Sequence, residues 1–276
     1  MLISSLQNAR VKHVVRLSSR RYRDAQRQTI VEGIRETSRA LEAGIIPSEA
    51  YICPDLIAGQ AAAAVVNRLQ QFNLSGETGL FEVTPSVFAK MAFRGESGGL
   101  LLVINYPEHT PEELLQRDDP FLVVLENAEK PGNVGAILRT ADAAGVSGMI
   151  LCPEDGRGTD LFNPNVIRAS LGAVFTVPVI TMAAREAVVW LKGAGIQIVA
   201  STPYASALYT DVSLRGPVAV VMGSEALGLS RHWLDAADMQ VRIPMSGVVD
   251  SLNLSVSTAL ILYEVVRQRS RNDEKD

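Results

Sequence analysis

The chain has 276 residues, of which 47% are hydrophobic, and a formal net charge of −4 at pH 7. This length and composition suit a globular protein with one large or two ordinary domains, and no run approaches the roughly 20 apolar residues of a membrane span. The two cysteines, Cys53 and Cys152, lie in separate predicted strands, and the three histidines are scattered, so neither a disulfide framework nor a metal site is expected. Residues 1–12 have no apolar signal core. These features predict a cytoplasmic protein without bound metal or membrane contact.

Basic residues are concentrated at the N-terminal end. Residues 1–40 hold nine of the 26 Lys/Arg but only three of the 30 Asp/Glu, a local balance of +6 against −10 for the rest of the chain. Such a cluster can neutralise several phosphates and gives salt-dependent attraction to RNA, although a solvated basic helix face is the alternative. The candidate RNA contacts in this segment are Arg10, Lys12, Arg20, Arg21 and Arg23.

The first 105 residues predict a small α/β module. Residues 7–44 follow a helical pattern, with likely breaks at Gly33 and Gly44. Strands and helices then alternate: strands at 50–53, 81–83 and 100–105, and helices at 57–71 and 85–92.

The next stretch contains prolines and acidic residues, and its apolar residues do not recur at the spacing of a helix or a strand. Residues 107–119 are therefore interpreted as a linker between domains 1–106 and 120–276. The second part again alternates, which predicts a mostly parallel sheet with helices on both faces. Its expected strands are residues 121–125, 148–152, 177–180, 197–201, 218–222 and 240–243, and its expected helices are 134–144, 164–171, 183–194, 230–236 and 253–268. The polar tail 270–276 is expected to fray.

Three loops of this second part follow predicted strands, where open α/β sheets bind their ligands. The first contains Asn133-x-Gly135 and leads into a helix that carries Arg139. The second contains Gly223-x-Glu225, and the third contains Ile243-Pro244 followed by Ser251-Leu252-Asn253. A single loop with spaced glycines is weak evidence, but three motifs in this order are specific.

Together these motifs resemble the SpoU/TrmH family of RNA ribose 2′-O-methyltransferases, over roughly residues 120–268. Residues 6–33 more weakly resemble the small ribosomal-protein-L30-like domain that precedes the catalytic domain in many members. The resemblance implies S-adenosylmethionine as cofactor, RNA as substrate, a homodimer and a C-terminal trefoil knot, which strand alternation cannot show. The apolar stripe Leu254, Thr258, Ile261, Leu262 and Val265 on the last helix is compatible with such a dimer.

The resemblance also implies roles for individual residues. Cofactor contacts are expected from Gly223, Ile243 and Leu252, with Met222 and Met245 adding to the apolar wall, although the apolar members also suit a core. The resemblance implies a catalytic group of Asn133, Arg139, Glu225, Ser251 and Asn253. Arg139 is expected to position and stabilise rather than to act as a base, because a guanidinium stays protonated. Arg168 is a further RNA candidate.

Structural alternatives exist for most of these residues. Arg139 could pair with Asp142 or Glu225, Ser251 and Asn253 could cap the following helix, and a structural role is favoured for Glu225.

The predicted function is S-adenosylmethionine-dependent methylation of 23S ribosomal RNA. A transfer-RNA ribose methyltransferase, an antibiotic-resistance enzyme acting on ribosomal RNA, and a catalytically silent ribosome-assembly factor stay open as alternatives. The target nucleotide has no transferable sequence code.

Overall fold

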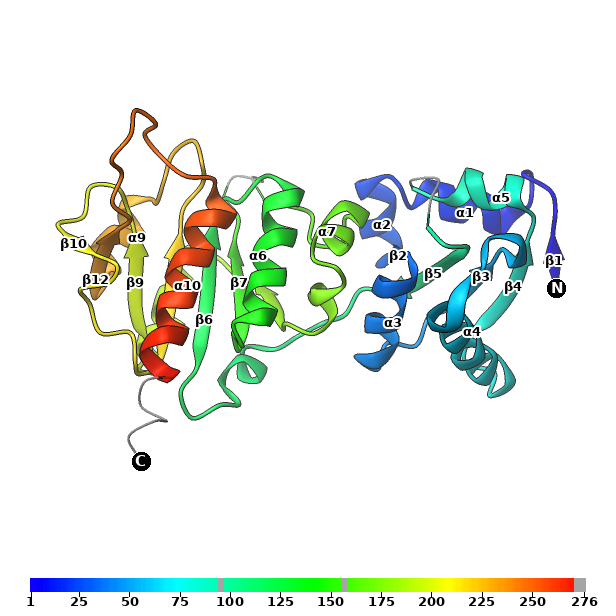
Figure 1. Cartoon of the computed structure of the whole chain (residues 1–276), viewed down its shortest axis with the longest axis horizontal. Helices are drawn as coiled ribbons and strands as arrows, with labels where there is room; N and C mark the ends of the chain where they lie inside the picture. The colour runs from blue at the N-terminus through cyan, green and yellow to red at the C-terminus, as the bar shows by residue number, and fades with distance from the viewer. Residues whose placement is uncertain (94–96, 155–157, 271–276) are drawn as a thin grey trace. The chain divides into compact units, whose positions relative to one another are not determined.

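The computed structural model of the chain describes residues 1–93, 97–154 and 158–270. Its contacts divide into two compact units (Figure 1). Unit 1 contains Met1–Pro107 together with Asp160–Thr176, and unit 2 contains Glu108–Thr159 and Val177–Asp276. The expected fraying of the tail falls on residues 271–276, which lie outside the described residues.

Unit 1 is built on a mixed sheet of strand order β1-β4-β3-β5-β2, in which β5 runs antiparallel to both β3 and β2. Apolar side chains of α1 and α5 pack over one face, around Tyr51, Phe81 and Leu101. The strands are β1 Leu2–Ile3, β2 Gln28–Glu32, β3 Glu49–Ile52, β4 Gly79–Val83 and β5 Leu100–Asn105. The helices are α1 Ala9–Arg16, α2 Arg20–Gln26, α3 Ile34–Glu42, α4 Gly59–Leu74, α5 Pro85–Met91 and α7 Pro164–Ala169.

The prediction of a helical pattern throughout residues 7–44 is wrong at β2. Gln28–Glu32 forms a strand because its three central residues, Thr29, Ile30 and Val31, are buried and two of them are β-branched apolar side chains. Its pairing partner is β5, about seventy residues later.

Residues 160–176 belong to unit 1, although the sequence division assigns them to the second domain. The Thr29 hydroxyl donates to the Phe162 carbonyl (2.7 Å), and the Arg39 guanidinium donates to the Leu171 carbonyl (2.9 Å). The rings of Tyr106 and Phe162 stack with centroids 4.2 Å apart. These contacts tie the segment that follows β7 to the small sheet.

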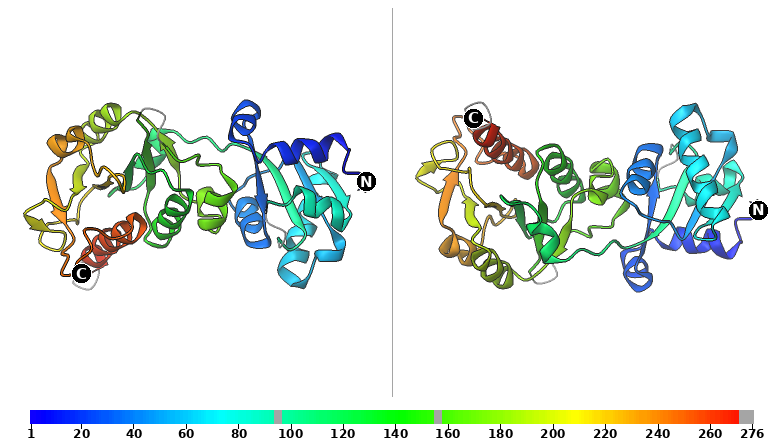
Figure 2. Two further views of the ribbon diagram at one scale, coloured as in Figure 1. Left: turned by 90° about the horizontal axis from the view of Figure 1, so that it is seen from above. Right: turned by 90° about the horizontal axis from the view of Figure 1, so that it is seen from below.

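Unit 2 contains a larger sheet of order β10-β12-β9-β11-β6-β7-β8, and every pairing in it is parallel. Helices α6 and α10 cover one face, and α8 and α9 cover the other (Figure 2). The predicted parallel sheet with helices on both faces is therefore confirmed. The strands are β6 Phe121–Glu126, β7 Gly148–Cys152, β8 Val179–Thr181, β9 Gln197–Ser201, β10 Ala207–Leu208, β11 Val218–Met222 and β12 Met239–Arg242. The helices are α6 Pro131–Ala143, α8 Ala184–Gly193, α9 Arg231–Ala236 and α10 Leu254–Ser270.

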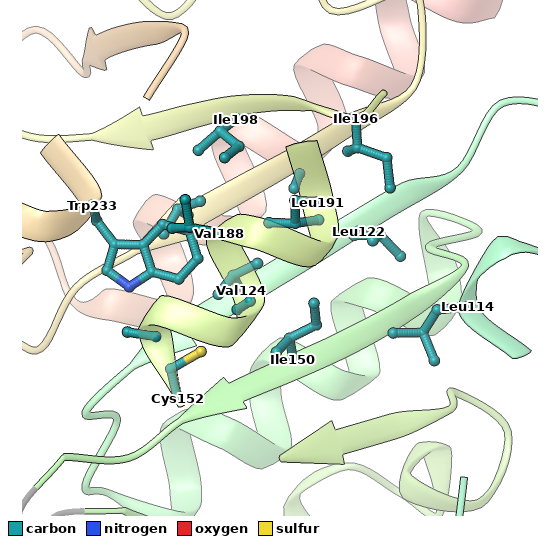
Figure 3. Packing of buried hydrophobic residues seen from close by; sticks show 14 of the residues in the cluster. Leu114, Leu122, Val124, Ile150, Cys152, Val188, Leu191, Ile196, Ile198 and Trp233 are labelled. Carbon is teal, nitrogen blue, oxygen red and sulfur yellow. The ribbon is translucent and has the colours of Figure 1, made fainter. Parts of the chain in front are cut away.

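The core beneath α8 and α9 is continuous. Trp233 is fully buried and packs in one cluster with Val124, Ile150, Cys152 and Leu191 (Figure 3). Leu114 also enters this cluster, although it lies in the predicted linker. It sits in the short 3-10 turn Pro111–Leu115, which begins with a capping box between Thr110 and Glu113. The linker is thus partly anchored to unit 2.

The apolar stripe of α10 does not face outward. Leu254, Thr258, Ile261, Leu262 and Val265 are all buried within the chain, where α10 contacts α6 and β11. These side chains are covered by the chain itself, so the stripe does not support the expected dimer. The trefoil knot stays a prediction from the resemblance.

Candidate functional site

The three motif loops meet at one edge of the unit 2 sheet, because they leave the carboxyl ends of parallel strands. β6 and β11 are neighbours, and β12 lies beyond β9. The strands that directly follow β6 in the chain, β7 and β8, lie on one side of it, whereas β11 and the strands beyond it lie on the other side. Open α/β sheets place ligands at such a change of side. The loop between β12 and α10 rises over this edge in Figure 1.

A chain of polar contacts joins the three loops. The Asn133 amide, at the start of α6, donates to the Glu225 carboxylate after β11. The Asn253 amide, before α10, donates to the Asn133 side-chain oxygen (3.1 Å). Asn133 is 92 positions from Glu225 and 120 positions from Asn253 in the sequence, and the structure brings all three together.

Asn253 also has a structural role. Its side-chain oxygen accepts hydrogen bonds from the Ser255 backbone N–H (2.9 Å) and from the Ser255 hydroxyl (2.7 Å), at the first turn of α10. Helix capping and loop bridging are thus combined in one side chain.

A hollow of about 820 Å³ opens beside these contacts. Its lining includes all five residues predicted to contact a cofactor: Met222, Gly223, Ile243, Met245 and Leu252. Glu225 and Ser251 also line it, and Ser201 and Thr202 extend it to the end of β9. The volume lies within the range of about 300–1,000 Å³ that small-molecule and cofactor sites occupy.

The loop after β11 folds tightly against Gly223. Ser224 and Gly228 exchange two backbone hydrogen bonds (3.2 and 3.0 Å), and the Leu227 N–H donates to the Ser224 hydroxyl (3.1 Å). A Cβ at Gly223 would lie 2.2 Å from the Gly228 carbonyl carbon. This glycine therefore allows the loop to close on itself, rather than only allowing a ligand to approach.

Two polar residues at this edge escaped the sequence analysis. Glu126, buried at the end of β6, accepts from the Ser230 N–H (2.7 Å) and so fixes the end of the β11 loop. Lys130 forms an ion pair with Glu225 (2.6 Å). The only signal for Glu126 is an acid closing an otherwise apolar strand, and Lys130 gives no signal beyond its place before Pro131.

Arg139 lies on the exposed side of α6. Within residues 1–93, 97–154 and 158–270, its guanidinium makes no recorded hydrogen bond or ion pair, so the alternative of a bond to Asp142 or Glu225 is not realised there. It does not belong to the lining of the 820 Å³ hollow. Within those ranges its guanidinium is thus not held by a hydrogen bond or ion pair that a ligand would have to replace.

The predicted RNA contacts in unit 1 differ in their exposure and in their ion pairs. Lys12, Arg21 and Arg168 are exposed, and Arg20 is exposed beside Asp24 (3.6 Å). Arg10 is partly exposed, but its guanidinium pairs with Glu49 and lies 4.4 Å from the centroid of the Phe81 ring.

Arg23 contradicts its prediction as an RNA contact. Its side chain is 1% exposed, donates to the carbonyls of Leu17 (2.7 Å) and Ser18 (2.8 Å), and pairs with Asp160. A guanidinium held in this way cannot reach a phosphate without leaving its site, so Arg23 is a structural residue.

Neither metal nor thiolate chemistry has a recognisable site in the part of the chain that the structure describes. No group of three or more His, Cys, Asp or Glu side chains there has metal-binding geometry. Burial, with help from the Glu126 and Glu154 charges, raises the pKa of Cys152 to about 12, so this thiol stays protonated near neutral pH. No described helix is long and apolar enough to cross a membrane.

Comparison with known proteins identifies the family. Residues 120–263, more than half of the chain, match the model of the SpoU rRNA Methylase family. The chain belongs to this family. Residues 8–101 match the MRM3-like substrate binding domain, so the N-terminal unit corresponds to a substrate-binding module.

Individual relatives agree with this assignment. A solved structure described as an RNA 2′-O ribose methyltransferase is 41% identical, with a TM-score of 0.83 over 98% of this chain and 100% of the other. The AdoMet-bound rRNA methyltransferase of Sinorhizobium meliloti is 28% identical, with a TM-score of 0.87 over 97% of each chain.

Among curated relatives, the 23S rRNA (guanosine-2′-O-)-methyltransferase RlmB of Shewanella oneidensis is 42% identical over 165 residues. That match covers 59% of this chain and 65% of the relative, so the chain spans slightly less than two thirds of its length.

Proposed function

We propose that this protein is an S-adenosylmethionine-dependent RNA ribose 2′-O-methyltransferase that acts on 23S ribosomal RNA in the cytoplasm. The observation that carries the proposal is the Glu225–Asn133–Asn253 chain beside a cofactor-sized hollow. The names of the similar proteins support the reaction and the ribosomal RNA substrate, and the match to a substrate-binding domain supports a separate module that holds this substrate.

The residues of the hollow fit S-adenosylmethionine. Ile243, Leu252 and Met222 offer apolar surface to a purine ring, and the backbone of the loop after Gly223 offers hydrogen-bonding groups. When bound, this cofactor supplies a methyl group activated by its sulfonium. No metal is needed for such a transfer.

The polar residues act on the acceptor ribose. Asn133 both donates and accepts, and its orientation is fixed by Glu225 and Asn253, so it can hold the ribose in one geometry. The Arg139 guanidinium stabilises negative charge near the 2′-oxygen, while a substrate phosphate accepts the hydroxyl proton. Ser251 lines the hollow beside these groups.

The deciding experiment is transfer of radiolabelled methyl from S-adenosylmethionine to total RNA that lacks this modification, followed by ribose-methylation mapping. We expect label at one nucleotide of 23S ribosomal RNA. Label in transfer RNA would instead identify the protein as a transfer-RNA ribose methyltransferase. Cofactor binding without label in any RNA or assembling ribosomal particle would favour the catalytically silent assembly factor.

The exposed N-terminal arginines provide a prediction for RNA binding. Reversing Arg20 and Arg21 to Glu should weaken binding and lower the slope of log Kd against log salt by about 1–2, because each neutralised phosphate contributes roughly 0.7–0.9 to it. The measurement is a filter-binding titration with a 23S transcript at several salt concentrations. Arg185→Glu/Lys192→Glu on the exposed side of α8 changes the charge equally and is the matched control. Equal effects of the two pairs would place the RNA contact elsewhere.

A homodimer is the expected assembly, and the exposed face of α10 is its proposed interface. Val256, Leu260 and Tyr263 are 48%, 38% and 49% exposed, and with Thr140 and Tyr209 they line an open hollow of about 600 Å³. A contiguous apolar surface of this kind favours association with another protein surface.

Leu260→Glu should therefore convert a dimer to a monomer, because it places a charge in the apolar interface. Light scattering after gel filtration measures this change. Val189→Glu, at an exposed valine of α8, is the control and should leave the mass unchanged. A wild-type monomer would contradict the assembly.

A further inference from the structure

A second, smaller hollow lies beside the proposed cofactor site. It has a volume of about 260 Å³ and shares Ser224, Glu225, Ala226 and Leu254 with the larger hollow. Its other walls come from residues 127–130 and from Asn133. This volume is below the range of complete small-molecule sites, so it suits part of a nucleotide, such as a ribose with its phosphate.

The charges around this hollow are unfavourable for RNA except at one residue. Glu129 and Glu225 contribute two carboxylates, and Lys130 is the only cation among the described residues that line it. A phosphate entering the hollow would meet two carboxylates that repel it, and among the described residues of the lining only the Lys130 ammonium would attract it. Lys130 is 68% exposed and Glu225 is 27% exposed, so the lysine has freedom to move.

We propose that Lys130 binds a phosphate of the acceptor RNA and that Glu225 holds this lysine in the free protein. RNA binding then exchanges the Lys130–Glu225 ion pair for a Lys130–phosphate pair. The exchange is inexpensive, since an exposed ion pair contributes little to stability and a lysine ammonium is a flexible point charge. This inference rests on the proposed function and adds a residue that positions the RNA.

The exchange connects RNA binding to the catalytic group. Glu225 is shared: one carboxylate oxygen pairs with Lys130, and the other accepts from Asn133. When Lys130 turns to the phosphate, Glu225 keeps Asn133 as its partner, and Asn133 keeps its bond from Asn253. Lys130 is therefore a positioning residue rather than a catalytic one.

The test compares variants of the full-length protein for binding to an unmodified 23S ribosomal RNA transcript at several salt concentrations. Lys130→Ala should weaken binding about threefold to tenfold and lower the salt slope by about 1, with Lys130→Arg close to wild type. S-adenosylmethionine affinity, measured by calorimetry, should stay within twofold. Lys192→Ala on α8 is the matched control for loss of an exposed lysine.

Glu225→Gln separates exchange from a purely structural ion pair. It frees Lys130 while its side-chain oxygen can still accept from Asn133, so RNA binding should tighten severalfold. The gain should disappear in the Lys130→Ala/Glu225→Gln double variant. Glu129→Gln removes a charge from the same hollow but leaves the Lys130–Glu225 ion pair intact. It should raise the RNA affinity less than Glu225→Gln does, and this smaller increase should persist when Lys130→Ala is added.

The outcomes distinguish this inference from the proposed function. If the wild type methylates RNA but Lys130→Ala binds RNA like Lys192→Ala, the role of Lys130 is wrong and the methyltransferase proposal stands. If no RNA is methylated but Lys130→Ala still lowers the salt slope and Glu225→Gln still tightens binding, the phosphate contact stands without the reaction. The exchange would be overturned if Glu225→Gln and Glu129→Gln raised the RNA affinity equally, both in the wild type and in the Lys130→Ala variant.

Discussion

Arg139→Ala lowers the rate of methyl transfer at least a hundredfold while the protein stays folded and binds its cofactor within a few-fold of wild type. Removing one group that stabilises developing charge typically costs 10²–10³ in rate. The stability should not change, because the Arg139 side chain is exposed and has no recorded partner within the described ranges. Cofactor affinity should persist because Arg139 is outside the lining of the larger hollow.

Single-turnover transfer to 23S transcript measures the rate, and calorimetry with S-adenosylmethionine measures the binding. Arg139→Lys keeps the charge but loses the planar fork of donors, so it should recover only part of the rate. Thermal melting of all three proteins checks the fold. Wild-type turnover in Arg139→Ala would remove this residue from the mechanism.

The sequence could predict the meeting of the three motif loops because that meeting follows from a general property of parallel sheets. Asn133, Glu225 and Asn253 each follow a strand or precede a helix at the same edge. Strand alternation and motif order therefore predict that they share this edge, but not the hydrogen bonds that join them. Apolar runs such as Val218–Met222 are buried on both faces, which also made their assignment as strands direct.

Long-range partners explain the predictions that were wrong. Arg23 belongs to a basic helical segment whose other arginines are exposed, and its partner Asp160 is 137 residues away. No local pattern distinguishes an arginine that faces solvent from one that faces a distant carboxylate. The same holds for β2, which needs β5 beside it to be a strand.

Helix α10 shows the limit of periodicity. Apolar residues occupy both its buried side, with Ile261 and Leu262, and its exposed side, with Leu260 and Tyr263. A helical period reveals that such faces exist but not which of them the chain itself covers. The contacts of α10 with α6 and β11 are tertiary, so periodicity alone does not show that the side with Ile261 and Leu262 is the buried one.

Gly223→Ala should lower both the stability of the protein and its affinity for S-adenosylmethionine, because the added methyl group has no space. The nearest atoms to a Cβ at this position are the Gly228 carbonyl carbon and oxygen and the Leu229 nitrogen, at 2.2, 2.3 and 2.3 Å. All three are backbone atoms, so relief requires opening the turn that Ser224 and Gly228 close with two hydrogen bonds. Overpacking of this kind typically costs about 1–3 kcal/mol.

That cost translates into a melting temperature lower by roughly 2–4 °C per kcal/mol for a domain of this size. Cofactor affinity should fall about tenfold or more, because the displaced turn forms a wall of the 820 Å³ hollow and about 1.4 kcal/mol corresponds to a factor of ten. Gly193→Ala at the end of α8 is the control, since a Cβ there meets no atom within 4 Å. If Gly223→Ala binds the cofactor like Gly193→Ala, the closed turn is not what shapes the site, and the hollow must owe its form to the loop between β12 and α10.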